Sequence, residues 1–451
     1  MTEVRIVHFG PGAFHRAHQA DYVDRLCRID PGWGIAAAAL RSTGTIEALR
    51  RQQGRYTLAI LGETPEYRPI DVHRRLFGPD DRAGLRAQLT EPGVELVTAT
   101  VTEKGYCLAP DGQIDFAHPD IVHDLADPDR PVSLAGWLAL ALADRRAAGV
   151  APFSVLSCDN MTGNGRKLRS AVIALAGRRD AELARWIAGE AVFPDTMVDS
   201  ITPATDDALR ARVRAACGWD DLCPVQREPY AAWVIEDILP RGAPELAEAG
   251  VILTGDVAGW ERAKLRILNG PHSALAYLGL LAGHETVAGA MADPQLAATV
   301  ARMMADEIIP ATGPGSFDLT GYSADILERF RNPAIAHQLA QIAWDGSQKL
   351  RYRLLDTMAD ALKRGTPFAL LARAVAAWIV FAVRESRAGR ALNDPLAGEI
   401  SARALDPAPA AALLGWRAVF PAALVEVPAV RTAIIDAACS LAGEAGLTIG
   451  G

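Results

Sequence analysis

The first half of the chain alternates between short apolar runs and amphipathic segments, and this alternation limits its fold more than any other feature. Patterns of buried strands occur at 5–9, 34–40, 94–102 and 153–158, and helical patterns occur at 15–28, 46–53 and 134–148. Strands that alternate with helices predict a mostly parallel, doubly wound α/β sheet. The runs 56–61 and 67–77 predict a hairpin inserted in that sheet.

From about residue 260 the strand patterns almost disappear. Helical periodicity then predominates, at 263–281, 294–308, 335–343, 350–363, 368–384, 397–404 and 429–442. A chain of 451 residues is also too long for one hydrophobic core. We therefore predict two domains, a Rossmann-type dinucleotide-binding domain at 1–258 and a mostly α-helical substrate and catalytic domain at 259–451.

Composition excludes several classes of partner. Half the residues are hydrophobic and the net charge is −8, so the chain is globular and nucleic acid is not an expected partner. The apolar runs are too short to span a bilayer, and the charged N-terminus does not resemble a signal peptide. Six cysteines without a CxxC pair argue against a structural zinc site and a disulfide framework. We expect a cytoplasmic protein without membrane contact, a monomer or small homo-oligomer.

A glycine-rich turn follows the first predicted strand. Gly10 and Gly12 flank a proline, and Phe14 and His15 open the next helix. Glycines at such a turn let the backbone approach a pyrophosphate, which then lies at the helix N-terminus. The third fingerprint position, usually Gly or Ala, is His15. The turn predicts dinucleotide binding, and the alternative is an ordinary strand-to-helix connection.

The end of the second predicted strand bears on which dinucleotide is bound. Rossmann domains that prefer NAD usually carry Asp or Glu there, for the ribose 2′-OH. This chain instead has Arg41, Ser42 and Thr43. These side chains suit a 2′-phosphate, but Arg41 can equally face solvent or stack on adenine. The expected cofactor is therefore NAD(H) or NADP(H), with the preference open.

Polar residues follow two further strands. Glu103 and Lys104 come after one of them and Asn160 after another. Residues just beyond the carboxyl ends of parallel strands line the ligand crevice of such a sheet. Asn160 is a candidate amide donor to a reacting oxygen. Taken singly, each of these residues is as readily explained as part of a turn.

Lys264, Asn269 and His272 lie in an apolar stretch of the helical half. Burial lowers the pKa of a lysine and makes it a usable base. In an ideal α-helix, Asn269 would lie about 140° and His272 about 80° around the axis from Lys264. Gly270-Pro271 predicts a break in this helix. The alternatives are a lysine that extends to the surface and a core histidine.

No metal site is predicted. His15 and His18 have the i, i+3 spacing of helical metal ligands, but no carboxylate or cysteine is close to them in sequence.

Together these motifs resemble the mannitol dehydrogenase family of long-chain polyol dehydrogenases, which includes fructuronate and tagaturonate reductases. The resemblance runs nearly end to end. It is carried by Phe9-Gly-Pro-Gly-Ala-Phe-His-Arg-Ala-His-Gln, Thr102-Glu-Lys-Gly-Tyr-Cys, Ser157-Cys-Asp-Asn, Met197-Val-Asp-Ser-Ile-Thr-Pro, Lys264-x4-Asn-x2-His, Arg331-Asn-Pro-Ala-Ile-Ala and Asp345-Gly-Ser-Gln-Lys.

The resemblance implies a role for each matching residue in a metal-independent hydride transfer. Lys264 would be the general base, and Asn160 and Asn269 would polarise the substrate oxygen. His272 would contact a substrate hydroxyl and orient the lysine, and Glu103 would relay protons to solvent. The resemblance further implies that Lys349 binds substrate and that Asp199 supports the site.

The chain departs from the family pattern around the substrate. Ser200 stands where Arg is usual, Lys104 where the mannitol enzymes usually have Gly, and Gln341 where they have a substrate-contacting Arg. The leading hypothesis is a dehydrogenase that interconverts a mannitol- or arabinitol-like polyol and its ketose. The alternative is a hexuronate reductase, for which Lys104, Lys349, Arg351 or Arg353 would supply the cation that a carboxylate needs. A dinucleotide-binding sensor without catalysis is the rival from another class.

Overall fold

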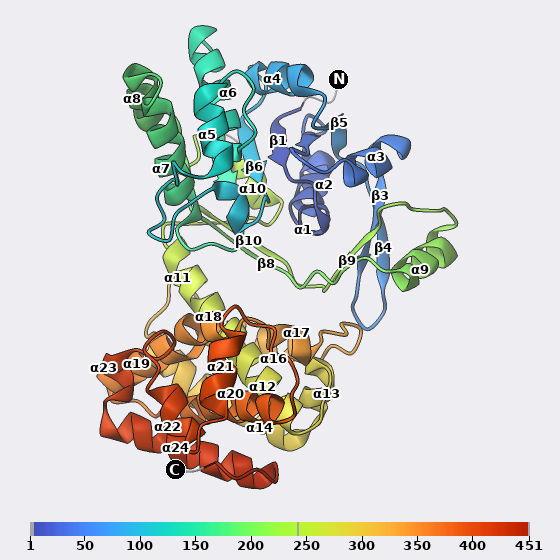
Figure 1. The fold of residues 1–451 in the computed structure, drawn as a ribbon. Helices are drawn as coiled ribbons and strands as arrows, with labels where there is room; N and C mark the ends of the chain where they lie inside the picture. The colour runs from blue at the N-terminus through green and yellow to red at the C-terminus, as the bar shows by residue number, and fades with distance from the viewer. Residues whose placement is uncertain (1–3, 241–242, 450–451) are drawn as a thin grey trace. The chain divides into compact units, whose positions relative to one another are not determined.

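The computed structural model describes residues 4–240 and 243–449. The chain divides into two compact units, Met1–Ala258 and Gly259–Gly451. Figure 1 shows each unit as a ribbon, with the strands confined to the first and helices making up the second. The fold class predicted from the sequence, a Rossmann-type domain followed by a helical one, is confirmed.

The main sheet of the first unit is parallel. Its strands lie in the order β5 (His73–Phe77), β2 (Ile35–Ala38), β1 (Ile6–Phe9), β6 (Leu96–Ala99) and β7 (Ser154–Ser157). β2 and β5 lie on one side of β1, and β6 and β7, which follow later in the chain, lie on the other side. The boundary between β1 and β6 is thus the topological switch point, where ligands bind beyond the carboxyl ends of the strands.

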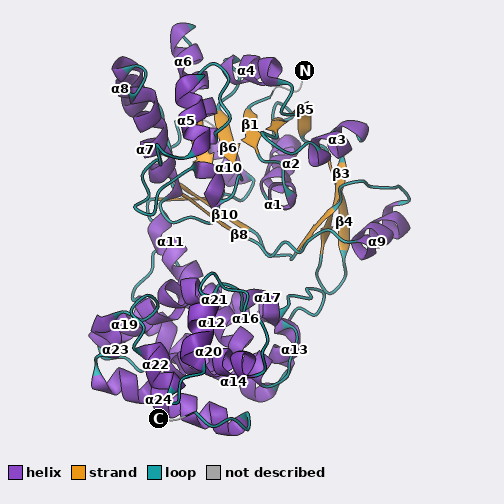
Figure 2. Cartoon of the chain, viewed as in Figure 1, coloured by secondary structure: helices purple, strands orange, loops and turns teal. Residues whose placement is uncertain are grey.

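Helices cover both faces of this sheet, as Figure 2 shows. Val7 and Phe9 face one core with residues of α4 (Arg82–Thr90), α6 (Leu134–Ala147), α7 (Asn164–Gly177) and α8 (Ala181–Glu190). Ile6 faces the other core with residues of α2 (Gln19–Ile29) and α3 (Gly44–Arg51). A strand buried on both faces is apolar throughout, which explains the continuous apolar runs in the sequence.

Two smaller sheets complete the first unit. One has the order β4 (Glu66–Ile70), β3 (Tyr56–Ile60), β9 (Val225–Arg227), and the other β11 (Ile252–Thr254), β10 (Ala232–Glu236), β8 (Thr196–Asp199). The predicted hairpin exists, but its insertion in the main sheet was wrong. The run 67–77 divides into β4, which pairs with β3, and β5, which joins β2. The hairpin's other neighbour is β9, a strand so distant in sequence that no local pattern indicates it.

The predicted helix at 15–28 is two helices, α1 (Ala13–Ala17) and α2, separated at His18. His18 leaves helical geometry, with φ −120° and ψ −85°. Its buried ring uses both nitrogens, since Nδ1 accepts from the Gln19 amide and Nε2 donates to the carbonyl of Ala232 on β10. Satisfying a fully buried imidazole explains the change of direction.

The second unit is built around α20 (Ala369–Arg387), which packs against α12 (Gly270–Leu281) and α24 (Pro428–Glu444). The other α-helices are α13 (Val287–Ala292), α14 (Pro294–Arg302), α15 (Ile309–Thr312), α16 (Leu319–Arg331), α17 (Leu339–Ile342), α18 (Gly346–Leu350), α19 (Asp356–Arg364), α21 (Ala397–Ala404), α22 (Pro409–Leu414) and α23 (Ala422–Val425). Three π-helical turns interrupt the described part, η2 (Lys264–Asn269), η3 (Met303–Ile308) and η4 (Arg351–Leu355).

The remaining elements of the first unit are the 3₁₀ turn η1 (Glu103–Tyr106), α5 (Pro119–Ala126), α9 (Asp207–Cys217) and α10 (Ala243–Glu248), and α11 (Val257–Ala263) runs from the end of the first unit into the second. Of the helices in the described ranges, none combines the length and apolar character that crossing a bilayer requires.

Candidate active site

The two glycines of the turn after β1 are required for different reasons. Gly10 has φ +87°, and a Cβ there would lie 2.2 Å from the carbonyl oxygen of Thr100. Gly12 has φ −69°, and a Cβ would meet only the Gly10 oxygen, at 3.8 Å. The fold therefore needs glycine at position 10 but not at position 12. No neighbouring protein atom requires glycine at position 12. A glycine there is explained if a ligand must approach the backbone closely.

A pocket of about 450 Å³ opens beside this turn, at the carboxyl ends of β1, β2 and β6. Gly10, Gly12, Arg41, Ser42 and Lys104 are among its lining residues. A pocket at the switch point of a doubly wound sheet is where a dinucleotide binds. The residues present thus fit NAD(H) or NADP(H).

Phe14 and His15, the two other residues predicted to bind the cofactor, follow the glycine turn and are less accessible. His15 is fully buried, its ring stacks on His8 with centroids 3.4 Å apart, and its Nε2 lies 3.0 Å from Nε2 of His73. Phe14 stacks on His18 with ring centroids 5.0 Å apart. These contacts support the turn from within, and direct contact with a cofactor stays a prediction.

Gly10→Ala and Gly12→Ala should have opposite effects. The first introduces a clash with backbone at a positive φ, and we expect it to cost at least about 2 kcal/mol of unfolding free energy. The second should change stability by less than about 1 kcal/mol while weakening NADH binding about tenfold or more, because the methyl group occupies space the pyrophosphate needs. Denaturant unfolding and NADH fluorescence titration measure the two effects. Normal NADH affinity in Gly12→Ala would argue against a pyrophosphate at this turn.

A strained loop follows β6. Thr102 has φ +64°, which is rare for a β-branched residue. Asp159, just after β7, holds this loop by accepting the backbone N–H groups of Val101 at 2.9 Å and Thr102 at 3.1 Å, and the hydroxyl of Tyr106 at 2.7 Å. Burial raises the pKa of the Asp159 carboxyl, and these hydrogen bonds oppose the rise. Sequence reasoning missed Asp159, although its place beside Asn160 at a strand end was a usable signal.

The catalytic candidates of the first unit lie where the sequence places them. Glu103 and Lys104 are exposed on the turn after β6, and Asn160 is exposed after β7. Asp199 ends β8, is buried, and lies opposite Ala232 in the β8–β10 ladder. The hydroxyl of Ser200, which stands where the family usually has Arg, donates to the carbonyl oxygen of Tyr230 at 3.0 Å.

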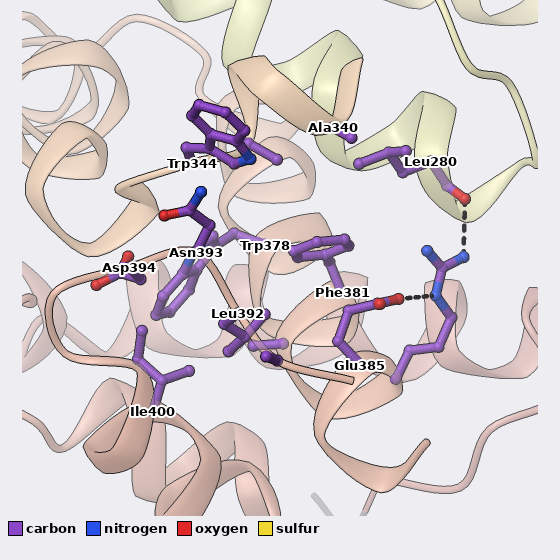
Figure 3. A pocket seen from close by; sticks show the side chains of 14 residues that line it. Leu280, Ala340, Trp344, Trp378, Phe381, Glu385, Leu392, Asn393, Asp394 and Ile400 are labelled. Atoms are coloured by element: carbon purple, nitrogen blue, oxygen red, sulfur yellow. Dashed lines mark hydrogen bonds and ion pairs between the residues drawn. The ribbon is translucent and has the colours of Figure 1, made fainter. Parts of the chain in front are cut away.

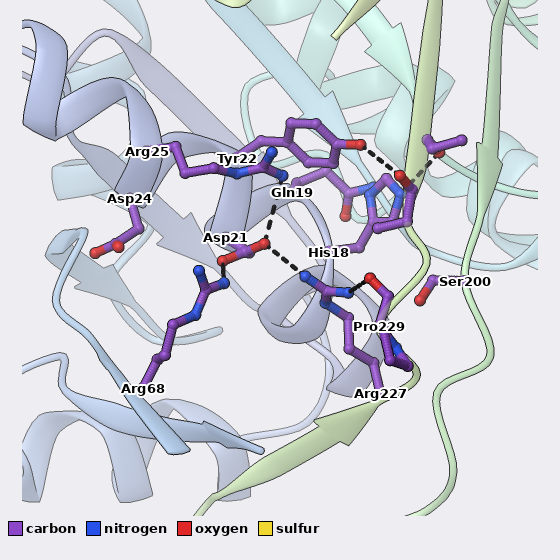
Figure 4. Close-up of polar contacts among 12 residues, drawn as sticks. His18, Gln19, Asp21, Tyr22, Asp24, Arg25, Arg68, Ser200, Arg227 and Pro229 are labelled. Atoms are coloured by element: carbon purple, nitrogen blue, oxygen red, sulfur yellow. Dashed lines mark hydrogen bonds and ion pairs between the residues drawn. The ribbon is translucent and has the colours of Figure 1, made fainter. Parts of the chain in front are cut away.

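A buried carboxylate ties α2 to the small sheet of β3, β4 and β9. Asp21 forms ion pairs with Arg68 on β4, with Arg227 on β9 at 2.8 Å and with Arg25 at 3.4 Å (Figure 4). Arg227 also donates to the carbonyl oxygen of Pro229 at 2.8 Å. Two partners lie 47 and 206 residues away along the chain, so no local sequence pattern indicates this network.

Lys264 and Asn269 begin and end the π-helical turn η2, and Lys264 is 9% exposed. The helix continues directly into α12, so the predicted break at Gly270-Pro271 was wrong. Pro271 has no N–H to donate and its ring would crowd the carbonyl four residues earlier. The wider i→i+5 register relieves that conflict without ending the helix. It also brings residues five apart nearly into line, which moves Asn269 toward the face of Lys264.

A second π-helical turn packs against the first. Gly270 lies so close to η4 that a Cβ there would be 2.8 Å from the carbonyl oxygen of Arg353. Arg353 donates to the Ser273 hydroxyl at 3.2 Å, while its Nε is buried and makes no hydrogen bond. Burial lowers the pKa of this guanidinium. Within the described residues, no carboxylate forms an ion pair with Arg353.

His272 is buried and neutral. Its ring stacks on Phe330 with centroids 4.3 Å apart and meets His337 edge-on at 5.2 Å, and its Nε2 makes no hydrogen bond. Burial, then the positive charges of neighbouring groups including Arg353, hold the pKa of His272 well below its usual value. Sequence reasoning anticipated a buried histidine here but did not identify its aromatic support.

Lys349 lies on α18 and donates to the carbonyl oxygen of Trp344 at 2.6 Å. Burial and the nearby Arg353 lower the pKa of its ammonium. A cavity of about 210 Å³ adjoins the same loop, and Figure 3 shows Trp344, Trp378 and Phe381 among its lining residues. Asp394 accepts the backbone N–H and the hydroxyl of Ser347 at 2.8 and 2.6 Å, which holds the start of α18.

In the described ranges, the ligand-type atoms of Cys107, His118 and Asp120 lie within 4.8 Å of one another. Asp120 forms an ion pair with Arg41, and His118 Nδ1 accepts the backbone N–H of Asp120. Burial raises the pKa of the Cys107 thiol to about 11. These groups are thus engaged within the protein, and the absence of a metal stays a prediction.

Comparison with known proteins identifies relatives of both units. The Mannitol dehydrogenase Rossmann domain family matches residues 4–248, and the Mannitol dehydrogenase C-terminal domain family matches 256–441. The uncharacterized oxidoreductase YeiQ of Escherichia coli (strain K12) is 42% identical over 88% of this chain and 83% of its own length. The D-mannonate oxidoreductase of the same organism is 40% identical over 93% and 89%.

The solved ternary complex of Pseudomonas fluorescens mannitol 2-dehydrogenase with NAD and D-mannitol has a TM-score of 0.81 at 36% identity, covering 98% of this chain and 93% of that one. Full-length similarity at this level, to both family domains, carries the reaction class as well as the fold. The chain belongs to the mannitol dehydrogenase family and is an NAD(P)-dependent oxidoreductase.

Proposed function

We propose that this enzyme interconverts a hexonate and the corresponding keto-uronate, with Lys264 as the general base. Lys264 would take the proton of the substrate hydroxyl as the carbon–oxygen bond becomes a carbonyl, and would return it in the reverse direction. The bound nicotinamide supplies the hydride acceptor or donor. Membership of the family gives the reaction class, whereas the base and the substrate are our proposal.

The other polar residues would act on the same oxygen and its surroundings. The amides of Asn160 and Asn269 would donate hydrogen bonds to the oxygen as negative charge develops on it. Glu103, exposed on its turn, would pass the proton between Lys264 and solvent. His272 is neutral, so its unbonded Nε2 can either accept from or donate to a substrate hydroxyl, depending on the tautomer.

Three further residues would complete the substrate site. Lys349 would contact a substrate oxygen, because its ammonium has three donors and its partners are the Trp344 carbonyl at 2.6 Å and the Asp345 carboxylate at 4.0 Å. Asp199 would support the site from the end of β8, and Lys104 would add positive charge from the turn after β6. The assignments of Lys349 and Asp199 rest on the family resemblance, and that of Lys104 rests on its charge.

The surroundings of Arg353 support a carboxylate substrate. The Arg353 side chain is partly buried, and its buried Nε makes no hydrogen bond, so the absence of a carboxylate partner is costly. It lies beside Ser273 and influences His272, on a turn packed against the Lys264–Asn269 turn. A planar guanidinium binds a carboxylate through two parallel hydrogen bonds, and an anionic substrate would supply the missing partner.

A neutral polyol and its ketose are the second candidate. The structural similarity to a mannitol 2-dehydrogenase in complex with D-mannitol favours them. Without a carboxylate, Arg353 would keep its Ser273 hydrogen bond, and polar groups of the substrate would have to satisfy its buried Nε.

A substrate panel with one pair of variants tests the proposal. NADH and NADPH oxidation would be followed with fructuronate, tagaturonate, fructose and xylulose, for the wild type, Arg353→Gln and Arg351→Gln. Arg351 is an exposed cation of the same turn. We expect the wild type to turn over the uronates. Arg353→Gln should lower kcat/KM for the uronates about 100-fold, as removal of one partner of a buried charge pair does. Arg351→Gln should retain most activity. Turnover of the neutral ketoses alone would instead establish that the enzyme interconverts a polyol and its ketose.

A further inference from the structure

Arg41, which lines the cofactor pocket, belongs to a charge pair that the sequence does not indicate. β2 ends without the acid that usually binds the ribose 2′-OH of NAD. Arg41 stands in that region, lines the pocket and has a side chain that is 72% exposed. By itself, an exposed arginine followed by Ser42 and Thr43 would attract the 2′-phosphate of NADP.

Arg41 has an acidic partner. Its guanidinium forms an ion pair with the carboxylate of Asp120, which lies 79 residues later in the first turn of α5 (Figure 1). The Asp120 side chain is only 21% exposed. Its backbone N–H donates to Nδ1 of His118, the residue that caps α5, and Sγ of Cys107 lies 3.9 Å from its Oδ2. The carboxylate is thus the fixed partner of the pair and the arginine the exposed one.

We propose that Asp120 is the residue that selects NAD over NADP, by supplying from α5 the carboxylate that β2 lacks. This inference rests on the placement of the cofactor in the pocket beside Gly12. In this proposal the carboxylate, which contacts Arg41 of the pocket lining, accepts the 2′-OH of NAD, as an acid at the end of the second strand does in other Rossmann domains.

The same carboxylate acts against NADP in two ways. It neutralises Arg41, so the pair offers no net positive charge to a phosphate. It also repels a phosphate monoester, which carries a charge of about −1.5 to −2 at pH 7. NADP would have to draw Arg41 away from Asp120 and leave the carboxylate beside the phosphate, and like charges in contact are a strong means of rejecting a wrong ligand.

The test is a double-mutant cycle read by binding. NADH and NADPH dissociation constants would be measured by fluorescence titration, without substrate, for the wild type, Asp120→Asn, Arg41→Gln and the double variant. Asp111→Asn is the matched control, because Asp111 is exposed in the segment before α5 and its loss changes the net charge equally. Circular dichroism checks folding, and Asp120→Glu keeps the charge if the amide variant is unstable.

We expect the wild type and Asp111→Asn to bind NADH more tightly than NADPH. Asp120→Asn should tighten NADPH binding about tenfold or more and weaken NADH binding severalfold. The NADPH gain should vanish in the double variant, because it depends on the freed Arg41, and Asp120→Glu should keep the preference for NADH. An unchanged ratio of the two constants in Asp120→Asn, or a wild type that prefers NADPH, would overturn the inference. Absence of binding by either cofactor would instead contradict the placement of the cofactor site.

Discussion

Lys264→Met should lower kcat about 10²- to 10⁴-fold, the range that a positioned general base contributes, while NADH binds with unchanged affinity. Lys264 is 9% exposed and begins a π-helical turn within an apolar segment. Methionine has a similar volume and no basic atom, so the fold should tolerate the change. Only the step that removes the hydroxyl proton loses its acceptor.

Steady-state kinetics with the best substrate and an NADH titration measure the two effects separately. Lys363→Met is the control, since Lys363 is an exposed lysine in the last turn of α19. Partial rescue of Lys264→Met by a small primary amine would show that the missing group is a base. Retention of more than a tenth of the wild-type kcat would exclude Lys264 from that role, and a dinucleotide sensor would have no turnover to lose.

We expect the dinucleotide-binding unit to unfold over a narrow range of pH when the pH is lowered. Burial lowers the pKa of His8, of His18 and of His73 to about 3 from an unfolded value of 6.5. These groups are therefore neutral in the folded state while the unfolded state takes up protons between pH 6.5 and about 3. Stability is complete above pH 6.5 and falls as the pH falls through this window, by about 1.4 kcal/mol per pH unit for each histidine.

Three such histidines give a slope of about 4 kcal/mol per pH unit. Since domains are stable by only about 5–15 kcal/mol, the unit should unfold between about pH 5 and 4. Urea unfolding from pH 7 to pH 5, followed by the intrinsic fluorescence of the nine tryptophans, of which Trp33 is fully buried in this unit, measures the slope. His73→Gln should lower it by about 1.4 kcal/mol per pH unit, and His123→Gln, at a side chain 45% exposed, should not. Equal slopes in all three proteins would refute this account.

Local sequence patterns determined the fold class and suggested the candidate site. The continuous apolar runs predict strands buried on both faces, and the glycine turn after the first of them predicts a dinucleotide pocket. Lys264, Asn269 and His272 drew attention because polar residues are conspicuous in an apolar segment. The inference of the fold class succeeds because strand period, helix period and turn chemistry act over a few residues, and the roles of the three polar residues stay predictions.

The tertiary structure decided the features that depend on distant partners. The ion pair of Asp120 with Arg41 joins residues 79 positions apart, and Asp21 meets arginines up to 206 positions away. The burial of Arg353 without a carboxylate depends on the packing of two π-helical turns. The first of these turns replaced the break expected at Gly270-Pro271. Each of these features depends on which distant groups the packed chain brings into contact or buries, and a local sequence pattern does not record that.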